Sequence, residues 1–157
     1  MYDDGYTNIL NVDISSVVIK QMIERNSVTR PLMAYEVMDV TDMSVLESNS
    51  FDVAIDKSTI DALLCGDNAQ LMVAKMTKEI QRILKKETGL YIAISYGKPE
   101  SREFHFEQPH LSFRKKQFIL YPSEVADDEE KKEEKSHYIY LNWKKADADE
   151  VCTAKWD

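Results

Sequence analysis

The sequence predicts an α/β fold in which a mostly parallel sheet closes with an antiparallel pair of strands. Along the first two thirds of the chain, short apolar segments alternate with segments of helical periodicity, which is typical of a parallel sheet covered by helices. Three of the apolar segments finish on an aspartate, at Asp13, Asp39 and Asp56. The last third holds two strand-like segments with no helix between them, a pattern that favours an antiparallel hairpin.

The first predicted element is a strand that leads directly into a helix. Residues 8–13 (NILNVD) form a short apolar run that ends in an acid. Ser15 or Ser16 can cap the helix that follows, because a serine oxygen accepts from the free N–H groups of the first turn. Val18 and Met22 share one face of this helix at i, i+4 spacing.

Two further apolar strands are predicted before the next long helix. Residues 30–40 (RPLMAYEVMDV) are entered after Pro31 and end near Asp39. Residues 51–59 (FDVAIDKST) contain the third strand, which finishes on Asp56. Each strand is therefore expected to present an acid at its carboxyl end.

The most regular helical pattern covers residues 68–86. Apolar residues recur there at spacings of three and four, and polar residues, Gln81 among them, take the other side. Gly89 follows at a position where a left-handed residue commonly ends a helix. Residues 90–95 (LYIAIS) then predict a fourth buried strand.

The remaining segments predict a loop and an edge hairpin. Residues 96–109 are expected to form a loop, and residues 111–122 (LSFRKKQFILYP) and 137–145 (HYIYLNWKK) an antiparallel pair. Residues 123–136 contain the charged run DDEEKKEEK. We expect a solvated loop there, and a recognition segment is the alternative.

Composition predicts a single cytoplasmic domain spanning residues 1–157. A net charge of -8 disfavours nucleic acid and anionic membranes as partners. Cys65 and Cys152 show neither CxxC spacing nor a nearby histidine pair, which favours a reduced setting and argues against a metal site. No apolar run approaches the roughly 18 residues of a membrane span.

The aspartates at the strand ends predict a ligand site. In an open parallel sheet, ligands bind beyond the carboxyl ends of the strands. Asp13 can accept from both hydroxyls of a ribose, and Asp39 from an exocyclic amine, with Val40 against a purine face. The alternative is that each aspartate caps a helix or begins a turn.

Several segments carry a resemblance to a known family. In chain order they are YDDGY, NILNVDISSVVIKQM, MDV, FDVAIDKSTIDALL and EIQRILKKETGLYIAIS. The chain resembles the class I S-adenosylmethionine-dependent methyltransferases, which have a Rossmann-like sheet. Within them it is most similar to the methyltransferase-like proteins that modify lysines and the N-terminus of translation elongation factor 1-alpha. The resemblance covers nearly the whole chain.

The resemblance implies a set of residues that bind S-adenosyl-L-methionine: Asp13, Ile14, Asp39, Val40, Asp56 and Lys57. Asp13 matches the acid that binds the ribose, and Ile14 lies beside it against the adenosine. Asp39 and Val40 match the pair that contacts the adenine. Lys57 matches a residue where the methyl group is presented. No catalytic residue is assigned.

The resemblance also implies a sheet ordered 3-2-1-4-5-7-6 with strand seven antiparallel. Members of the family begin with a strand and a glycine-rich loop, whereas Gly5, Gly66, Gly89 and Gly97 form no G-x-G arrangement. We therefore expect an N-terminally truncated domain without the first strand and its loop. Such a domain is expected to bind cofactor weakly, and a second copy can cover the missing strand.

The function implied by the resemblance is N-methylation of protein lysines, with translation elongation factor 1-alpha as a candidate partner. One alternative is a non-catalytic binding or scaffold protein derived from a methyltransferase, which the missing glycine loop favours. Another is a nicotinamide-dependent oxidoreductase, since an acid after the second strand also binds ribose there. His105 and His110 are expected to be ordinary exposed loop histidines.

Overall fold

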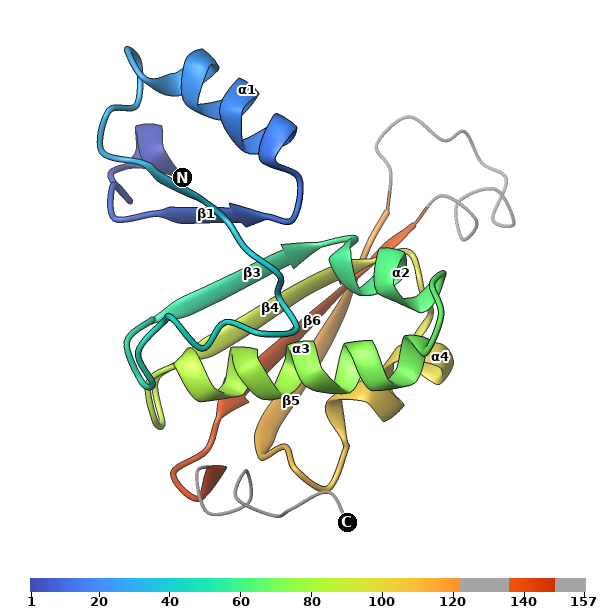
Figure 1. Ribbon diagram of the computed structural model, residues 1–157. Coiled ribbons are helices and arrows are strands. Elements are labelled where there is room, and N and C mark those ends of the chain that lie inside the picture. Colours follow the sequence, from blue (N-terminus) through green and yellow to red (C-terminus); the bar gives the residue numbers. More distant parts are fainter. Residues whose placement is uncertain (122–135, 149–157) are drawn as a thin grey trace. The chain divides into compact units, whose positions relative to one another are not determined.

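The computed structural model of the chain describes residues 1–121 and 136–148 (Figure 1). The chain divides into two compact units, Met1–Met43 and the part that begins at Ser44. The predicted charged loop lies outside the described residues except for Ser136. Within the described ranges, no helix is long and apolar enough to cross a membrane.

The first unit is a small parallel β-α-β arrangement. It consists of a 3-10 turn η1 (Tyr2–Asp4), strand β1 (Leu10–Asp13), helix α1 (Ser16–Asn26) and strand β2 (Ala34–Val37). The strands pair in parallel, with Leu10 opposite Ala34 and Asp13 opposite Val37. Ser15 caps α1 by accepting from the Val18 N–H at 3.3 Å, which confirms the predicted start of this helix.

The strand β2 is shorter than the sequence predicts. Residues 30–40 were expected to be extended, but only Ala34–Val37 are. The Arg30 N–H donates to Asn26 O at 2.7 Å and the Met33 N–H to Arg30 O at 3.2 Å. Pro31 and its neighbours therefore form the turn after α1. Apolar composition alone does not distinguish such a turn from a strand.

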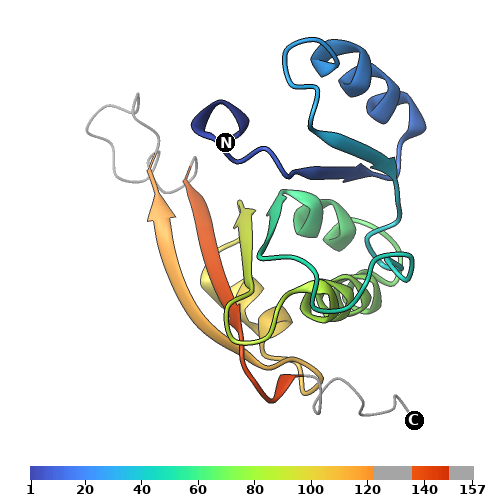
Figure 2. The same ribbon diagram turned by 90° about the vertical axis from the view of Figure 1, so that its left-hand side faces the viewer.

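The second unit holds a four-stranded sheet and three helices. Its elements are β3 (Val53–Lys57), α2 (Thr59–Leu64), α3 (Ala69–Ile83), β4 (Leu90–Ser95), α4 (Pro99–Phe106), β5 (Phe113–Leu120) and β6 (His137–Lys144). The strand order is β3-β4-β6-β5. β3 and β4 are parallel, and β6 is antiparallel to both of its neighbours. Figure 2 shows β5 and β6 side by side, which confirms the predicted antiparallel pair.

Both sheet orders agree with the order that the resemblance implies. β2 and β1 take the places of its third and second strands, and β3-β4-β6-β5 those of its strands four, five, seven and six. In β4, Tyr91, Ala93 and Ser95 are buried while the residues between them are partly exposed. The Tyr91 ring packs edge-on against Phe106 of α4, with centroids 5.9 Å apart. Helix α4 therefore covers the buried face of this sheet.

The segment after β4 was predicted to be a loop, and that prediction is wrong. Pro99 occupies the first turn of α4, where its missing N–H costs nothing and its fixed φ suits a helix. The helix buries His105 and Phe106, and His110 is also buried. Burial lowers the pKa of both imidazoles. The expectation of two exposed loop histidines is therefore wrong as well.

Helix α3 confirms the predicted apolar face, but Gln81 does not lie on the polar side. Its side chain is fully buried. Gln81 Nε2 donates to His110 O at 3.1 Å and to Ala148 O at 3.3 Å, and its Oε1 accepts from the Ser112 N–H at 2.6 Å. An amide can be buried when its donors and acceptor are all satisfied.

Gly89 is not the left-handed cap that the sequence predicts. Helix α3 ends at Leu84 in extended conformation, and the left-handed residue in the connection is Glu87, with φ 63°. A Cβ on Gly89 would lie 2.5 Å from Lys85 O. Glycine is needed there because the backbone passes too close for a side chain.

Two non-glycine residues with left-handed backbone conformation lead to a stability prediction. Ser58 (φ 66°) and Glu87 (φ 63°) carry a Cβ in a conformation that disfavours it. We expect Ser58→Gly and Glu87→Gly each to raise the free energy of unfolding by about 0.5–1 kcal/mol. Urea unfolding measures this. The control is Lys86→Gly, beside Glu87, where the added freedom of the unfolded chain should lower stability; equal effects at Glu87 and Lys86 would contradict the argument.

Candidate functional site

In the first unit, the structure brings Asp13 and Asp39 to the same edge. β1 and β2 are parallel, so their carboxyl ends lie together, and the Met38 N–H donates to Asp13 O at 3.0 Å. Asp13 Oδ1 accepts from the Ser15 N–H at 2.8 Å. Asp39 Oδ1 accepts from both the N–H and the hydroxyl of Thr41, each at 2.8 Å. Both acids thus make the turn contacts that the alternative interpretation expected.

These turn contacts use one oxygen of each carboxylate. Among the described residues, no hydrogen bond reaches Oδ2 of Asp13 or of Asp39. Asp13 is half-buried, Asp39 is exposed, and Ile14 is 73% exposed beside Asp13. Val40 is half-buried. This edge can therefore offer acceptors to hydroxyl or amine groups and apolar surface to a flat ring.

In the second unit, Asp56 has a different environment. It is 6% exposed, and both of its oxygens accept hydrogen bonds. Oδ1 accepts from the Thr59 N–H at 2.7 Å, and Oδ2 from the Ile60 N–H at 3.2 Å and the Tyr91 hydroxyl at 3.1 Å. Burial, and then the nearby Asp56 carboxylate, hold the pKa of Tyr91 well above its ordinary value. Asp56 therefore caps α2, and its contact with a cofactor stays a prediction.

Lys57 follows Asp56 and is exposed at the end of β3. The next residue, Ser58, takes the left-handed conformation, and its N–H donates to Ile94 O at 2.9 Å. This bond ties the turn after β3 to the end of β4. A backbone contact thus fixes the end of β3, while the side chain of Lys57 is exposed to solvent.

A cluster around Asp61 was missed by sequence reasoning. Asp61 Oδ1 accepts from the Ser95 hydroxyl and from Arg102 Nη2, the latter at 2.8 Å, and its Oδ2 accepts from the Tyr96 N–H at 3.2 Å. Ser95 Oγ in turn accepts from the Gly97 N–H at 2.9 Å. The contacts join the first turn of α2 to the end of β4 and to α4. Asp61 stands in the quoted segment DKSTIDALL, but nothing in its spacing identified these partners.

The cluster sets the charge state of Asp61. Burial raises the pKa of the carboxyl, but hydrogen bonds from Ser95, Arg102 and Tyr96 outweigh burial and hold the pKa below its ordinary value of 3.8. The side chains of Arg102 and Asp61 are only 15% and 18% exposed. The ion pair is therefore shielded from water more than a surface pair is.

The lowered pKa gives a pH-dependent prediction for Asp61→Asn. At pH 7 the variant should lose about 1–3 kcal/mol of unfolding free energy, because charged hydrogen bonds become neutral. Since the pKa is lower in the folded state, the contribution of the carboxylate is fully present above the ordinary value and is lost as the pH falls through the folded-state pKa. Urea unfolding of both proteins between pH 7 and pH 3 measures the difference. Asp67→Asn, at an exposed position, is the control; a loss that stays constant as the pH falls would contradict this role.

Comparisons with known proteins agree on one family. The family model described as "Methyltransferase domain" matches residues 1–92, a range that contains every predicted cofactor residue. An "eEF1A lysine and N-terminal methyltransferase" from Bos taurus is 44% identical over 97 residues, which make up 60% of this chain and 14% of that protein. "EEF1A lysine methyltransferase 4" from Bos taurus is 32% identical over 117 residues, or 69% of this chain and 45% of that protein.

Solved structures show the same fold. A structure described as a SAM-dependent methyltransferase from Methanosarcina mazei matches with a TM-score of 0.54 and 12% identity, over 87% of this chain and 81% of that chain. This likeness confirms the predicted Rossmann-like α/β class. The match of the family model covers more than half of the 157 residues. The chain belongs to the methyltransferase domain family.

Proposed function

We propose that this chain takes part in S-adenosylmethionine-dependent N-methylation of a protein, with a lysine side chain as acceptor. The observation that carries the proposal is the 44% identity to a protein named for methylation of eEF1A. The chain spans 14% of that relative's length, so the substrate is part of the proposal. eEF1A is the candidate substrate. A cytoplasmic location follows for an enzyme that meets a translation factor.

The first unit fits the adenosine half of S-adenosylmethionine. Asp13 and Asp39 each keep an oxygen that accepts no hydrogen bond from the described residues. Ribose hydroxyls and an exocyclic amine are donors that such oxygens accept. Ile14 adds exposed apolar surface beside Asp13. These residues would hold the nucleoside, as the sequence predicts.

We expect this chain to offer fewer hydrogen-bond donors to the methionine half of the cofactor than a domain with a glycine-rich loop offers. A glycine-rich loop lets backbone N–H groups approach a ligand closely, and the four glycines of the sequence form no G-x-G arrangement. Each lost hydrogen bond to a charged group is worth about 1.5–3 kcal/mol. Two or three such losses would weaken binding by about a hundredfold or more.

The chemistry constrains what the protein residues must do. Bound S-adenosylmethionine supplies a methyl group on a positively charged sulfur, which a neutral amine can attack. The chain's part is to orient the amine and to keep it unprotonated. Lys57, exposed at the end of β3, is a cationic neighbour that would disfavour an ammonium there.

Cofactor binding gives a direct test of the adenosine contacts. We expect this chain to bind S-adenosylmethionine weakly, and Asp13→Ala to lower the affinity by a further tenfold or more, because a charged hydrogen bond is lost. Isothermal titration at high protein concentration measures both. Glu24→Gln, at an exposed position of α1, is the control for a change of charge in the same unit. Tight stoichiometric binding by the unmodified chain would overturn the account of the missing loop, and unchanged affinity in Asp13→Ala would overturn the assignment of Asp13.

A non-catalytic binding protein is the second candidate, and the lack of a G-x-G arrangement favours it. Transfer of labelled methyl groups to purified eEF1A separates the two functions. If the chain is catalytic, label should accumulate on lysines at saturating cofactor, and Asp39→Ala should reduce the rate at low cofactor concentration. Stable binding of eEF1A without label, at every cofactor concentration, would instead support the non-catalytic candidate.

A further inference from the structure

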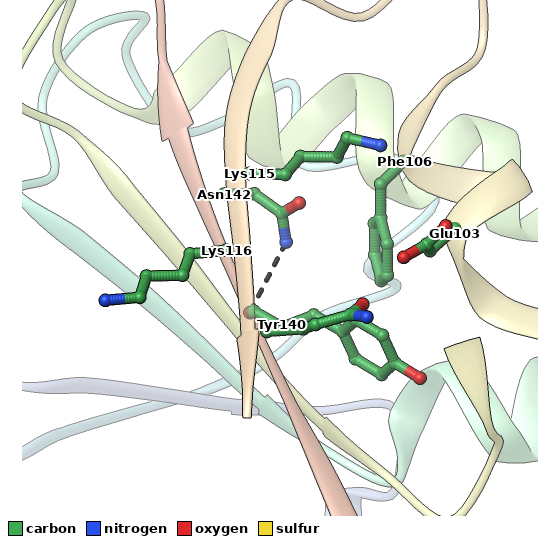
Figure 3. Close-up of a pocket in the computed structure, with 7 residues that line it drawn as sticks. Glu103, Phe106, Lys115, Lys116, Tyr140 and Asn142 are labelled. Carbon is green, nitrogen blue, oxygen red and sulfur yellow. Dashed lines mark hydrogen bonds between the residues drawn. The ribbon is translucent and has the colours of Figure 1, made fainter. Parts of the chain in front are cut away.

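The second unit contains a cavity that is lined by none of the predicted cofactor residues. It has a volume of about 240 Å³ and lies between α4 and the strands β5 and β6 (Figure 3). Its lining residues are Glu103, Phe106, Lys115, Lys116, Gln117, Tyr140 and Asn142. Pockets for whole small-molecule ligands usually measure about 300–1,000 Å³. This one suits a single side chain or a small amine.

The antiparallel register explains how the lining residues meet. Lys115 pairs with Asn142, and Gln117 with Tyr140, and directly paired residues project from the same face of a sheet. This is the face that α4 covers. Lys116 lies between them in sequence and projects to the opposite side of β5, as Figure 3 shows. Lys116 therefore belongs to the rim rather than to the interior.

Asn142 is the feature that points to a ligand. It is 1% exposed, and its Nδ2 donates to Tyr140 O at 3.4 Å. Its Oδ1 is buried and accepts no hydrogen bond from any described residue. The orientation follows from the partner, because a carbonyl can only accept and so faces the amide nitrogen. Figure 3 shows the oxygen on the side of Phe106. Buried polar atoms without a partner are rare in native proteins.

The other walls add a negative charge and two aromatic rings. Phe106 and Tyr140 have ring centroids 5.3 Å apart, at 40°. The Tyr140 hydroxyl is already used, since it donates to Gly97 O at 2.6 Å. Lys115 is paired with Glu107. Within the described part of the chain, the Glu103 carboxylate makes no ion pair or hydrogen bond, so it and Asn142 Oδ1 are two acceptors left to a ligand, beside the exposed Gln117 amide.

We propose that this cavity binds the ammonium end of a lysine side chain from a basic polypeptide. The ammonium N–H groups would donate to Asn142 Oδ1 and Glu103, and the rings of Phe106 and Tyr140 would contact the alkyl stem and the cation. The buried unpartnered atom of the lining, Asn142 Oδ1, is an acceptor, which favours an N–H donor over an anion as the ligand. The proposal is independent of methyl transfer, since the cavity uses none of the predicted cofactor residues.

The test uses Nα-acetyl-lysine methylamide and amide NMR spectra of the full chain. We expect saturable shifts of the Asn142 side-chain amide and of backbone signals at Lys115 and Gln117, at millimolar concentrations of the probe. Two related probes are compared with it. The trimethyl-lysine derivative keeps the positive charge but has no N–H on its side chain, and the norleucine derivative has neither the charge nor a side-chain N–H. Both should bind at least tenfold more weakly.

Two variants and one control link the shifts to the cavity. Glu103→Gln should lower the affinity for the lysine probe several-fold. Asn142→Leu should lower it tenfold or more while leaving the thermal midpoint unchanged or raised, because an unsatisfied polar atom is removed. Glu100→Gln, at an exposed position of α4, should leave the affinity for the lysine probe unchanged.

Three outcomes would overturn the proposal. The first is no saturable shift at the cavity residues with the lysine probe. The second is equal binding of the trimethyl-lysine or norleucine probe, which would exclude N–H donation as the basis of recognition. The third is unchanged affinity in folded Glu103→Gln, which stays informative if Asn142→Leu fails to fold. Methyl transfer in the same preparation separates a failure of this site from a failure of the proposed function.

Discussion

The second unit depends on the buried carboxylate of Asp56. A buried charge is costly unless donors satisfy it, and here the first turn of α2 and the Tyr91 hydroxyl do so. Tyr91 packs against Phe106, and Phe106 against Tyr140. One carboxylate at the end of β3 is thus connected through successive contacts to β4, α4 and β6. Because each of these contacts involves a buried group, we expect a substitution at Asp56 to disturb packing across the sheet.

Helix α2 shows why the segment around Asp56 is specific in sequence. It has only six residues, and isolated helices of that length are not stable in water. Asp56 caps its first turn, and Asp61 fastens the same turn to Ser95 and Arg102. Both acids of DKSTIDALL therefore hold this helix against β3 and β4. Lys57 is the charged residue of the segment that stays exposed.

The fold was largely predictable from periodicity. Alternation and apolar runs located the strands, and the serine before α1 located its first residue. What periodicity missed depends on contacts between segments far apart in sequence. Gln81 is polar but buried, because its partners come from residues 110, 112 and 148. Gly89 is required by a close backbone approach rather than by its own φ. Pro99 at the start of α4 is a local indication of a helix, but proline is also common in turns and loops, so it does not by itself distinguish the two.

The candidate site was predictable only as a set of acids, because the sequence does not say which oxygens are already occupied. Asp56 and Asp61 accept from protein donors with both oxygens. Asp13 and Asp39 each use one oxygen in a local turn. An acceptor that already has its donors contributes to stability, and one that lacks them can bind a ligand. The same criterion that favours Asp13 and Asp39 as nucleoside contacts also selects Asn142, a residue that has no charge and belongs to no motif. Unsatisfied acceptors therefore identify the residues that can still receive a donor from a ligand, which the presence of an acid at a strand end does not.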